Sequence, residues 1–115
     1  MDARRQVGIS GEQRAVEHLK RQGYRILERN WRTAWGELDI VASSGKELVF
    51  VEVRTLEAPY VGFPEESVGP AKRRQLARLA TAYVQKAKFE GDWRIDVIAI
   101  DRDGLRHIQN AVSLW

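Results

Sequence analysis

The chain has no cysteine, only three prolines and one methionine, and no apolar run long enough to cross a membrane. Without cysteine there is neither a disulfide framework nor a thiolate metal site. A bound metal would therefore need oxygen or imidazole ligands, which favours Mg²⁺ or Mn²⁺. The first residues are charged and lack the apolar core of a secretory signal. We predict a cytoplasmic protein with no membrane partner.

The composition is typical of a folded protein. Apolar residues make up 43% of the 115 residues and charged residues 30%, a balance found in globular chains and not in disordered ones. A chain of this length suits one hydrophobic core. We expect a single domain over residues 1–115.

The formal net charge of +3 is unevenly distributed along the chain. Residues 34–70 carry two basic and seven acidic side chains, whereas residues 71–88 carry six basic and no acidic ones. Residues 1–33 are also basic, with eight Lys/Arg against four Asp/Glu. An acidic centre between basic flanks suits an enzyme that binds a cation and a polyanionic chain together, although charged runs also form ordinary solvated faces.

Residue spacing predicts two helices and five strands. Residues 10–13 have the spacing of a capping box, and apolar repeats place a first helix within residues 4–22, ended by Gly23. The glycine-containing loop 43–46 predicts that its two flanking strands pair antiparallel. The other predicted elements are strands at 24–30, 37–42 and 47–54, a loop at 55–70, a helix at 71–88, and strands at 93–100 and 105–108. This order, αβββαββ, indicates an α/β protein.

Two acidic side chains are expected to meet across that hairpin. With regular alternation, Glu37 and Asp39 share one face of their strand, while Leu38 and Ile40 occupy the other. In the next strand Glu52 interrupts the apolar run LVFVEV, where a buried carboxylate needs a partner or a metal. The candidate metal ligands are therefore the side chains of Asp39 and Glu52 and the backbone carbonyl of Val53. The alternative is a pair of strand carboxylates bonded to nearby arginines.

Four motifs stand out in order along the chain. They are GELDIVA at 36–42, FVEVR at 50–54, ESV at 66–68 followed by Lys72, and RIDVI at 94–98. Together they resemble the UPF0102 (YraN-type) endonuclease-like proteins, from Gly11 to Ala111. The resemblance implies a restriction-endonuclease-like fold, with a three-layer αβα core around a mixed β-sheet. It also implies a PD-(D/E)xK-type site, similar to that of archaeal Holliday-junction resolvases.

The same resemblance implies roles for individual residues. Asp39 and Glu52 match the motif carboxylates that bind metal, and Glu12 on the first helix matches the acidic residue that completes such a site. The family pattern ends Val-Glu-Val-Lys, whereas this chain has Arg54 at the lysine position. An arginine neutralises developing charge but does not give up its proton. Either Arg54 clamps the phosphate, or Lys72 reaches in from the second helix as a displaced lysine.

The basic face of the second helix is the expected DNA-binding surface. Trp31 and Trp35, interleaved with arginines, either stack on exposed bases or pack against the core. The expected nucleic-acid-binding residues are Lys72, Arg73, Arg74, Arg78 and Arg32.

Four further residues are expected to have no catalytic or metal-binding role. Arg94 and Asp96 fall on one face of a buried strand and predict an internal ion pair. His18 and His107 are single histidines with no pattern that indicates a ligand role.

The leading interpretation is a metal-dependent endonuclease acting on DNA, including branched or otherwise structured DNA. A second is a nucleic-acid-binding module that kept the fold but lost turnover through Arg54. A third is an interaction protein whose loop 55–70 docks a partner chain. Because resolvase-like relatives cut two strands as symmetric dimers, we also expect a homodimer.

Overall fold

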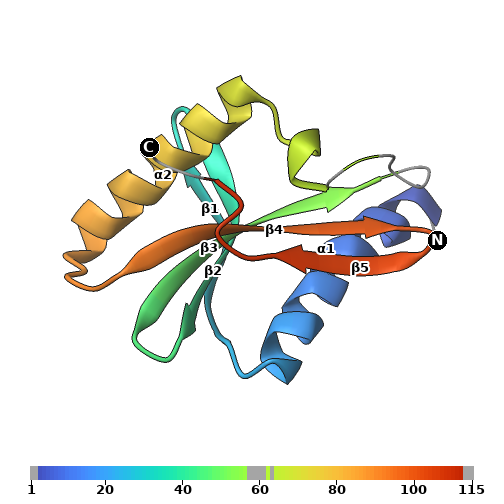
Figure 1. Cartoon of the computed structure of the whole chain (residues 1–115), viewed down its shortest axis with the longest axis horizontal. Helices are drawn as coiled ribbons and strands as arrows, with labels where there is room; N and C mark the ends of the chain where they lie inside the picture. Colours follow the sequence, from blue (N-terminus) through green and yellow to red (C-terminus); the bar gives the residue numbers. More distant parts are fainter. Residues whose placement is uncertain (1–2, 57–61, 63, 113–115) are drawn as a thin grey trace.

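Within the part of the chain that the structure describes, two α-helices and five strands follow one another in the predicted order αβββαββ (Figure 1). The computed structural model describes residues 3–56, 62 and 64–112, and side chains at 11–56, 62 and 66–112. The elements are α1 (Ala3–Arg21), β1 (Arg25–Thr33), β2 (Gly36–Ser44), β3 (Glu47–Thr55), a short 3-10 helix η1 (Pro64–Ser67), α2 (Pro70–Ala87), β4 (Trp93–Asp101) and β5 (Gly104–Ile108).

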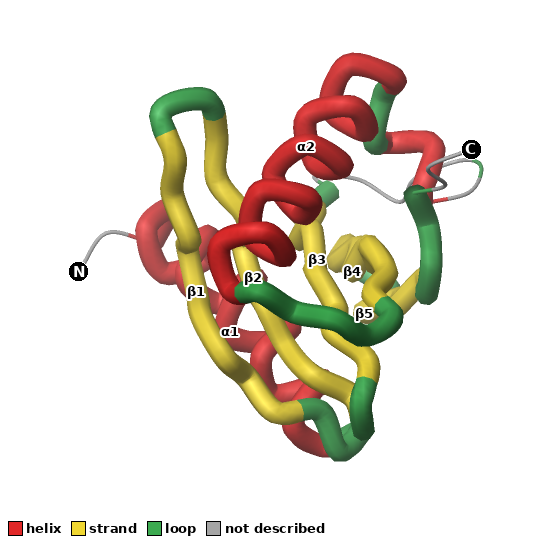
Figure 2. Tube along the Cα trace, turned by 90° about the vertical axis from the view of Figure 1, so that its left-hand side faces the viewer, coloured by secondary structure: helices red, strands yellow, loops and turns green. Residues whose placement is uncertain are grey.

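The strands form one mixed sheet in the order β1-β2-β3-β4-β5. Strands β1, β2 and β3 pair antiparallel in sequence, which confirms the predicted hairpin at 43–46. Strand β4 pairs parallel to β3 and antiparallel to β5. The β3–β4 connection crosses one face of the sheet through α2, while α1 covers the opposite face (Figure 2). This is the three-layer α/β arrangement with a mixed sheet that the family resemblance implied.

A separate apolar cluster fills each side of the sheet. On the α2 side, Leu76 and Leu79 pack with Leu38 and Phe50. The cluster on the α1 side is built from Ala15, Val16, Leu19, Ile40, Val49, Val51, Ile98 and Ile100. Because β3 and β4 are covered on both faces, their sequences are nearly continuous apolar runs. A polar side chain in either strand is therefore an exception.

The first helix, predicted within residues 4–22, is confirmed, because α1 runs from Ala3 to Arg21. Ser10 lies inside the helix, so the capping-box spacing at residues 10–13 does not mark the helix start. The predicted end is confirmed: Gly23 follows α1 with φ of 89°, a left-handed conformation that suits glycine.

The predicted loop 55–70 is only partly within the described residues. Residues 57–61 and 63 lie outside them. Strand β3 continues to Thr55, Leu56 N donates to Ile100 O at 2.7 Å, and η1 occupies Pro64–Ser67. Neither helix of the described chain combines the length and the apolarity needed to cross a membrane.

Candidate active site

The position of Asp39 depends on an irregularity in β2. Leu38 belongs to the α2-side cluster and Ile40 to the α1-side cluster, so the two side chains point to opposite faces. The prediction that they share a face is wrong, because regular alternation fails at the residue between them. On the neighbouring strand the same level is occupied by Asn30, whose φ is 55°. Both strands are therefore distorted where the site is built.

The distortion directs the Asp39 carboxylate at β3. The β2–β3 register begins at Ile40 opposite Val51, and beyond this pair Asp39 Oδ2 accepts a hydrogen bond from Val53 N at 2.9 Å. The side chain thus satisfies a backbone donor of β3 where the two strands separate. This bond holds Asp39 next to Glu52, as the sequence predicted.

Glu52 is buried, with an exposed fraction of 6%. It is two residues from Phe50, so alternation along β3 places it on the α2 side of the sheet. Lys72 Nζ of α2 lies 3.7 Å from Glu52 Oε2, but no described residue hydrogen-bonds to that oxygen. A buried carboxylate oxygen without a hydrogen bond is unfavourable, and a cation there would compensate it.

Burial and mutual repulsion shift the titration of both carboxyl groups. Burial, followed by the charge of Asp39, raises the pKa of Glu52 to about 7, against the opposing effects of Lys72 and Arg54. Burial also raises the pKa of Asp39, opposed by the Val53 N–H and reinforced by Glu12 and Glu37. The two carboxyls lie within hydrogen-bonding reach of each other, a contact that needs a shared proton. At neutral pH the Glu52 carboxyl is therefore protonated in part of the molecules.

The other two carboxylates near the pair already have cationic partners. Glu12 Oε1 accepts from Asn30 Nδ2 at 3.1 Å and lies 3.3 Å from Arg29 Nη2. Glu37 Oε2 accepts from Arg32 Nε at 2.7 Å. Arg32, predicted to contact phosphate, therefore pairs with an acidic neighbour. Among the described side chains, no three from Asp, Glu, His and Cys gather closely enough to hold an ion by themselves.

Three basic residues that were predicted to bind phosphate make different contacts in the structure. Arg54 Nη2 donates to Ser67 O at 3.1 Å, which ties β3 to η1. Arg73 Nε donates to Val68 O at 2.8 Å, so the geometry gives Arg73 a structural contact. Lys72 is the member that reaches the acidic pair. Lys72 remains a candidate phosphate contact, together with Arg74 and Arg78 on the exposed part of α2.

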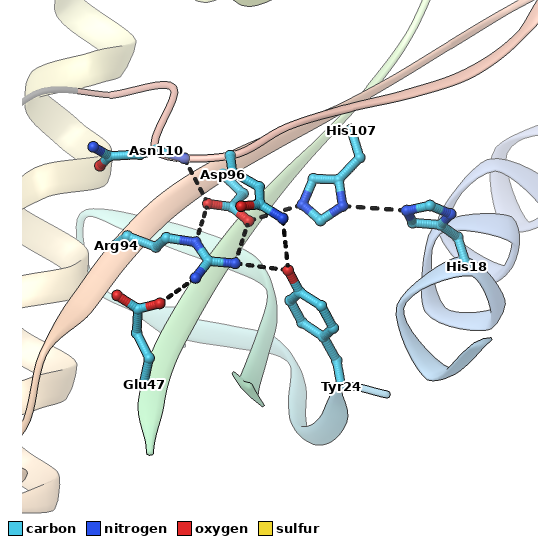
Figure 3. Close-up of polar contacts among 8 residues, drawn as sticks. His18, Tyr24, Glu47, Arg94, Asp96, His107 and Asn110 are labelled. Carbon is cyan, nitrogen blue, oxygen red and sulfur yellow. Dashed lines mark hydrogen bonds and ion pairs between the residues drawn. The ribbon is translucent and has the colours of Figure 1, made fainter. Parts of the chain in front are cut away.

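A second polar cluster lies between α1 and the sheet (Figure 3). Asp96 is fully buried, and the ion pair predicted with Arg94 is present, with Arg94 Nε 3.0 Å from Asp96 Oδ1. Asp96 Oδ1 also accepts from Asn110 N at 2.9 Å. These bonds and the one from His107 outweigh burial and lower the pKa of Asp96. Each oxygen of this carboxylate has a partner, in contrast to Glu52.

Two histidines that the sequence left separate meet in this cluster. His107 Nε2 lies 2.8 Å from Asp96 Oδ2, and His107 Nδ1 lies 3.2 Å from His18 Nε2 (Figure 3). Burial, then the charges of His107 and Arg21, lower the pKa of His18. The two histidines are 89 positions apart in the sequence, so no local pattern could indicate their contact.

The sequence matches over residues 11–100 the family described as Uncharacterised protein family UPF0102. A UPF0102 protein of Persephonella marina is 43% identical over 108 residues, which cover 93% of this chain and 93% of that relative. One from Moorella thermoacetica is 48% identical over 98 residues, covering 84% and 82%. A third, from Mycolicibacterium vanbaalenii, is 41% identical over 116 residues, covering 98% and 93%. None of these names states an activity.

Proposed function

The chain belongs to the UPF0102 family, and from this premise we propose that it is a metal-dependent endonuclease that hydrolyses DNA at the Asp39–Glu52 pair. The observation that carries the proposal is Glu52, which is buried, lacks a hydrogen bond to Oε2 within the described chain, and faces a second carboxyl. A purely structural pair would be unfavourable in this position. A divalent cation would neutralise both groups.

The available donors suit Mg²⁺ or Mn²⁺. They are hard oxygens from Asp39, Glu52 and the Val53 carbonyl, which leave further positions for water and a phosphate oxygen. The bond from Val53 N fixes the orientation of Asp39 in advance. Glu12 supports the site through its charge, since its own carboxylate is bonded to Arg29 and Asn30. When bound, the ion would polarise the phosphate and acidify a water molecule.

We assign the role of the motif lysine to Lys72 and not to Arg54. The ammonium of Lys72 lies beside Glu52, whereas the guanidinium of Arg54 is held by the carbonyl of Ser67. An ammonium in this position can donate to a phosphate oxygen and stabilise the charge that develops there during attack. Arg54 acts at longer range, where its charge lowers the pKa of Glu52.

Cleavage of labelled DNA in the presence of Mg²⁺ or Mn²⁺ tests this assignment. Asp39→Asn and Glu52→Gln should each slow cleavage by about 100-fold or more, and Lys72→Met by about tenfold or more. Asp103→Asn changes an exposed acid in the β4–β5 turn and serves as the matched control. Cleavage that persists in Glu52→Gln or in EDTA would contradict the proposal.

A homodimer belongs to the same proposal, because a symmetric pair of single-site subunits can cut both strands of a DNA duplex in one binding event. Sedimentation of the protein with and without DNA measures this directly. A monomer in both conditions would contradict it.

The bond from Arg54 to Ser67 favours a second candidate function, a nucleic-acid-binding module without turnover. In that case wild type would be inactive, Arg54→Lys would regain cleavage because arginine at this position is the cause of the loss, and DNA affinity would be the same with and without metal. The endonuclease proposal instead expects wild type to cleave and Arg54→Lys to remain active.

A further inference from the structure

The two tryptophans near the β1–β2 turn have different environments. Trp31 packs into the α2-side cluster, edge-on to Tyr83 with ring centroids 5.2 Å apart. Trp35 lies in the turn itself and is 46% exposed. The sequence left core packing and base stacking open for both residues. The structure gives Trp31 the first role and leaves a large apolar surface of Trp35 facing solvent.

The backbone around Trp35 is held rigidly. Trp35 N donates to Thr33 Oγ1 at 3.2 Å, and Gln75 Nε2 of α2 donates to Trp35 O at 2.8 Å. The Arg78 guanidinium lies 5.4 Å from the centre of the indole ring, in cation-π geometry. The ring also borders a hollow of about 410 Å³ lined by Trp35, Ala77, Arg78, Thr81, Ala82 and Gln85. An exposed ring fixed in this way is preorganised for a flat ligand.

A single surface connects Trp35 to the acidic pair. Lys72, Gln75 and Arg78 follow one another at intervals of three on α2, so they share one side of that helix. Lys72 contacts Glu52 at one end, and Arg78 contacts Trp35 at the other. Trp35, in the turn that leads into β2, precedes Asp39 by four residues, a length of roughly 13 Å in an extended chain. That length equals about four steps of a stacked nucleic-acid strand at about 3.4 Å each.

We propose that Trp35, backed by Arg78, stacks on an unpaired base of the DNA strand whose phosphate lies at the Asp39–Glu52 pair. The substrate class is therefore DNA with a single-stranded stretch beside the cleavage position. Bases inside a duplex are covered on both faces by their neighbours, so only an unpaired base presents a face to an indole. The arginines and lysine along the same surface complement the phosphates of that strand. The link to cleavage rests on the proposed function, whereas the stacking contact does not.

Binding measured in EDTA tests the stacking contact apart from cleavage. The probes are fluorescein-labelled dT12, a twelve-nucleotide chain of the same charge in which every site is abasic, and a blunt duplex. Wild type should bind dT12 at least about 5-fold more tightly than the abasic chain. Trp35→Ala should remove most of this difference, and Trp35→Phe should restore much of it. Leu27→Ala, which truncates another exposed apolar side chain (41% exposed), should leave it unchanged.

The outcomes separate the two proposals. Equal affinity of wild type for dT12 and the abasic chain, or an unchanged dT12 affinity in Trp35→Ala, would overturn the stacking contact even if the protein cleaves DNA. The absence of dT12 binding would overturn it as well, and would direct attention to a protein partner for the Trp35 surface. A clear Trp35→Ala effect in a protein that never cleaves DNA would support the stacking contact and contradict the endonuclease proposal.

Discussion

Glu52 and Asp96 show how the same kind of side chain serves different purposes in one sheet. Both are buried acids in central strands. Asp96 receives hydrogen bonds from Arg94, His107 and Asn110, and its pKa is lowered. Glu52 has a carboxyl neighbour and a pKa raised to about 7. A satisfied acid stabilises the fold, whereas an unsatisfied one indicates a binding site.

The raised pKa of Glu52 predicts that stability falls as pH rises. Because the group binds its proton more tightly in the folded protein, its contribution is complete below about pH 4.5 and is lost as pH rises through about 7. In metal-free buffer, wild type should lose about 2 to 3 kcal/mol between pH 5 and pH 8 relative to Glu52→Gln. Urea unfolding of both proteins at several pH values measures the difference.

The comparison with Glu52→Gln isolates the Asp39–Glu52 pair, because Asp96 and His18 titrate in both proteins. Glu17→Gln, an exposed acid of α1, is the matched control and should follow wild type. Parallel pH profiles for wild type and Glu52→Gln would show that Glu52 titrates normally, which would contradict a buried carboxyl pair that shares a proton.

At the scale of elements, the packing of the β1–β2 turn on α2 determines where the basic helix lies. Gly36 has φ of 151°, and a Cβ at this position would lie 2.5 Å from Gln75 Nε2 and 3.1 Å from Leu79 Cδ1. The glycine therefore permits both the backbone conformation and the close approach of the helix. The same helix carries Lys72 toward Glu52.

Gly36→Ala should destabilise the protein by at least about 2 kcal/mol, because it adds a contact with α2 to a strained backbone. Gly45→Ala is the matched control: its φ is 60° and nothing lies within 4 Å of the added Cβ. We expect it to lose only about 1 kcal/mol. Denaturant unfolding of the two variants measures the difference, and equal losses would mean that the contact with α2 is unimportant.

The elements themselves followed from sequence patterns, because the apolar run of β3 and the three- and four-residue repeats of α2 are local properties. The break in alternation between Leu38 and Ile40 did not, since it arises from the way β1, β2 and β3 fit together. Its only local sign is Asn30, a residue type that tolerates positive φ. The prediction that Asp39 and Glu52 lie close together is confirmed. The hydrogen bond from Arg54 to the Ser67 carbonyl could not be predicted from the sequence.

At the scale of the whole molecule, folding gathers charges that are scattered in the sequence. The acidic pair comes from the middle of the sheet, while Lys72, Arg74 and Arg78 come from the helix that covers it. Contacts between distant residues, such as His18 with His107, cannot be predicted from local patterns either. Local patterns therefore predicted the helices and strands well, but not the contacts of His18 with His107 or of Arg54 with Ser67.

The basic surface of α2 predicts a defined salt dependence. If Lys72, Arg74 and Arg78 contact phosphates, the affinity for DNA should fall with salt at a log-log slope of about −2 to −3. Arg74→Gln should reduce the magnitude of the slope by about one, whereas Arg102→Gln in the β4–β5 turn should not change it. Fluorescence anisotropy over a salt series measures these slopes, and a flat response would contradict the role of α2.

The central claim, that Asp39 and Glu52 share a divalent cation, is tested most directly by crystals of the protein soaked in Mn²⁺ at pH 8. We predict an anomalous peak among the Asp39 carboxylate, the Glu52 carboxylate and the Val53 carbonyl, and no such peak in Glu52→Gln. A wild-type crystal without that peak, in which the Lys72 or Arg54 side chain lies between the two carboxylates instead, would contradict it.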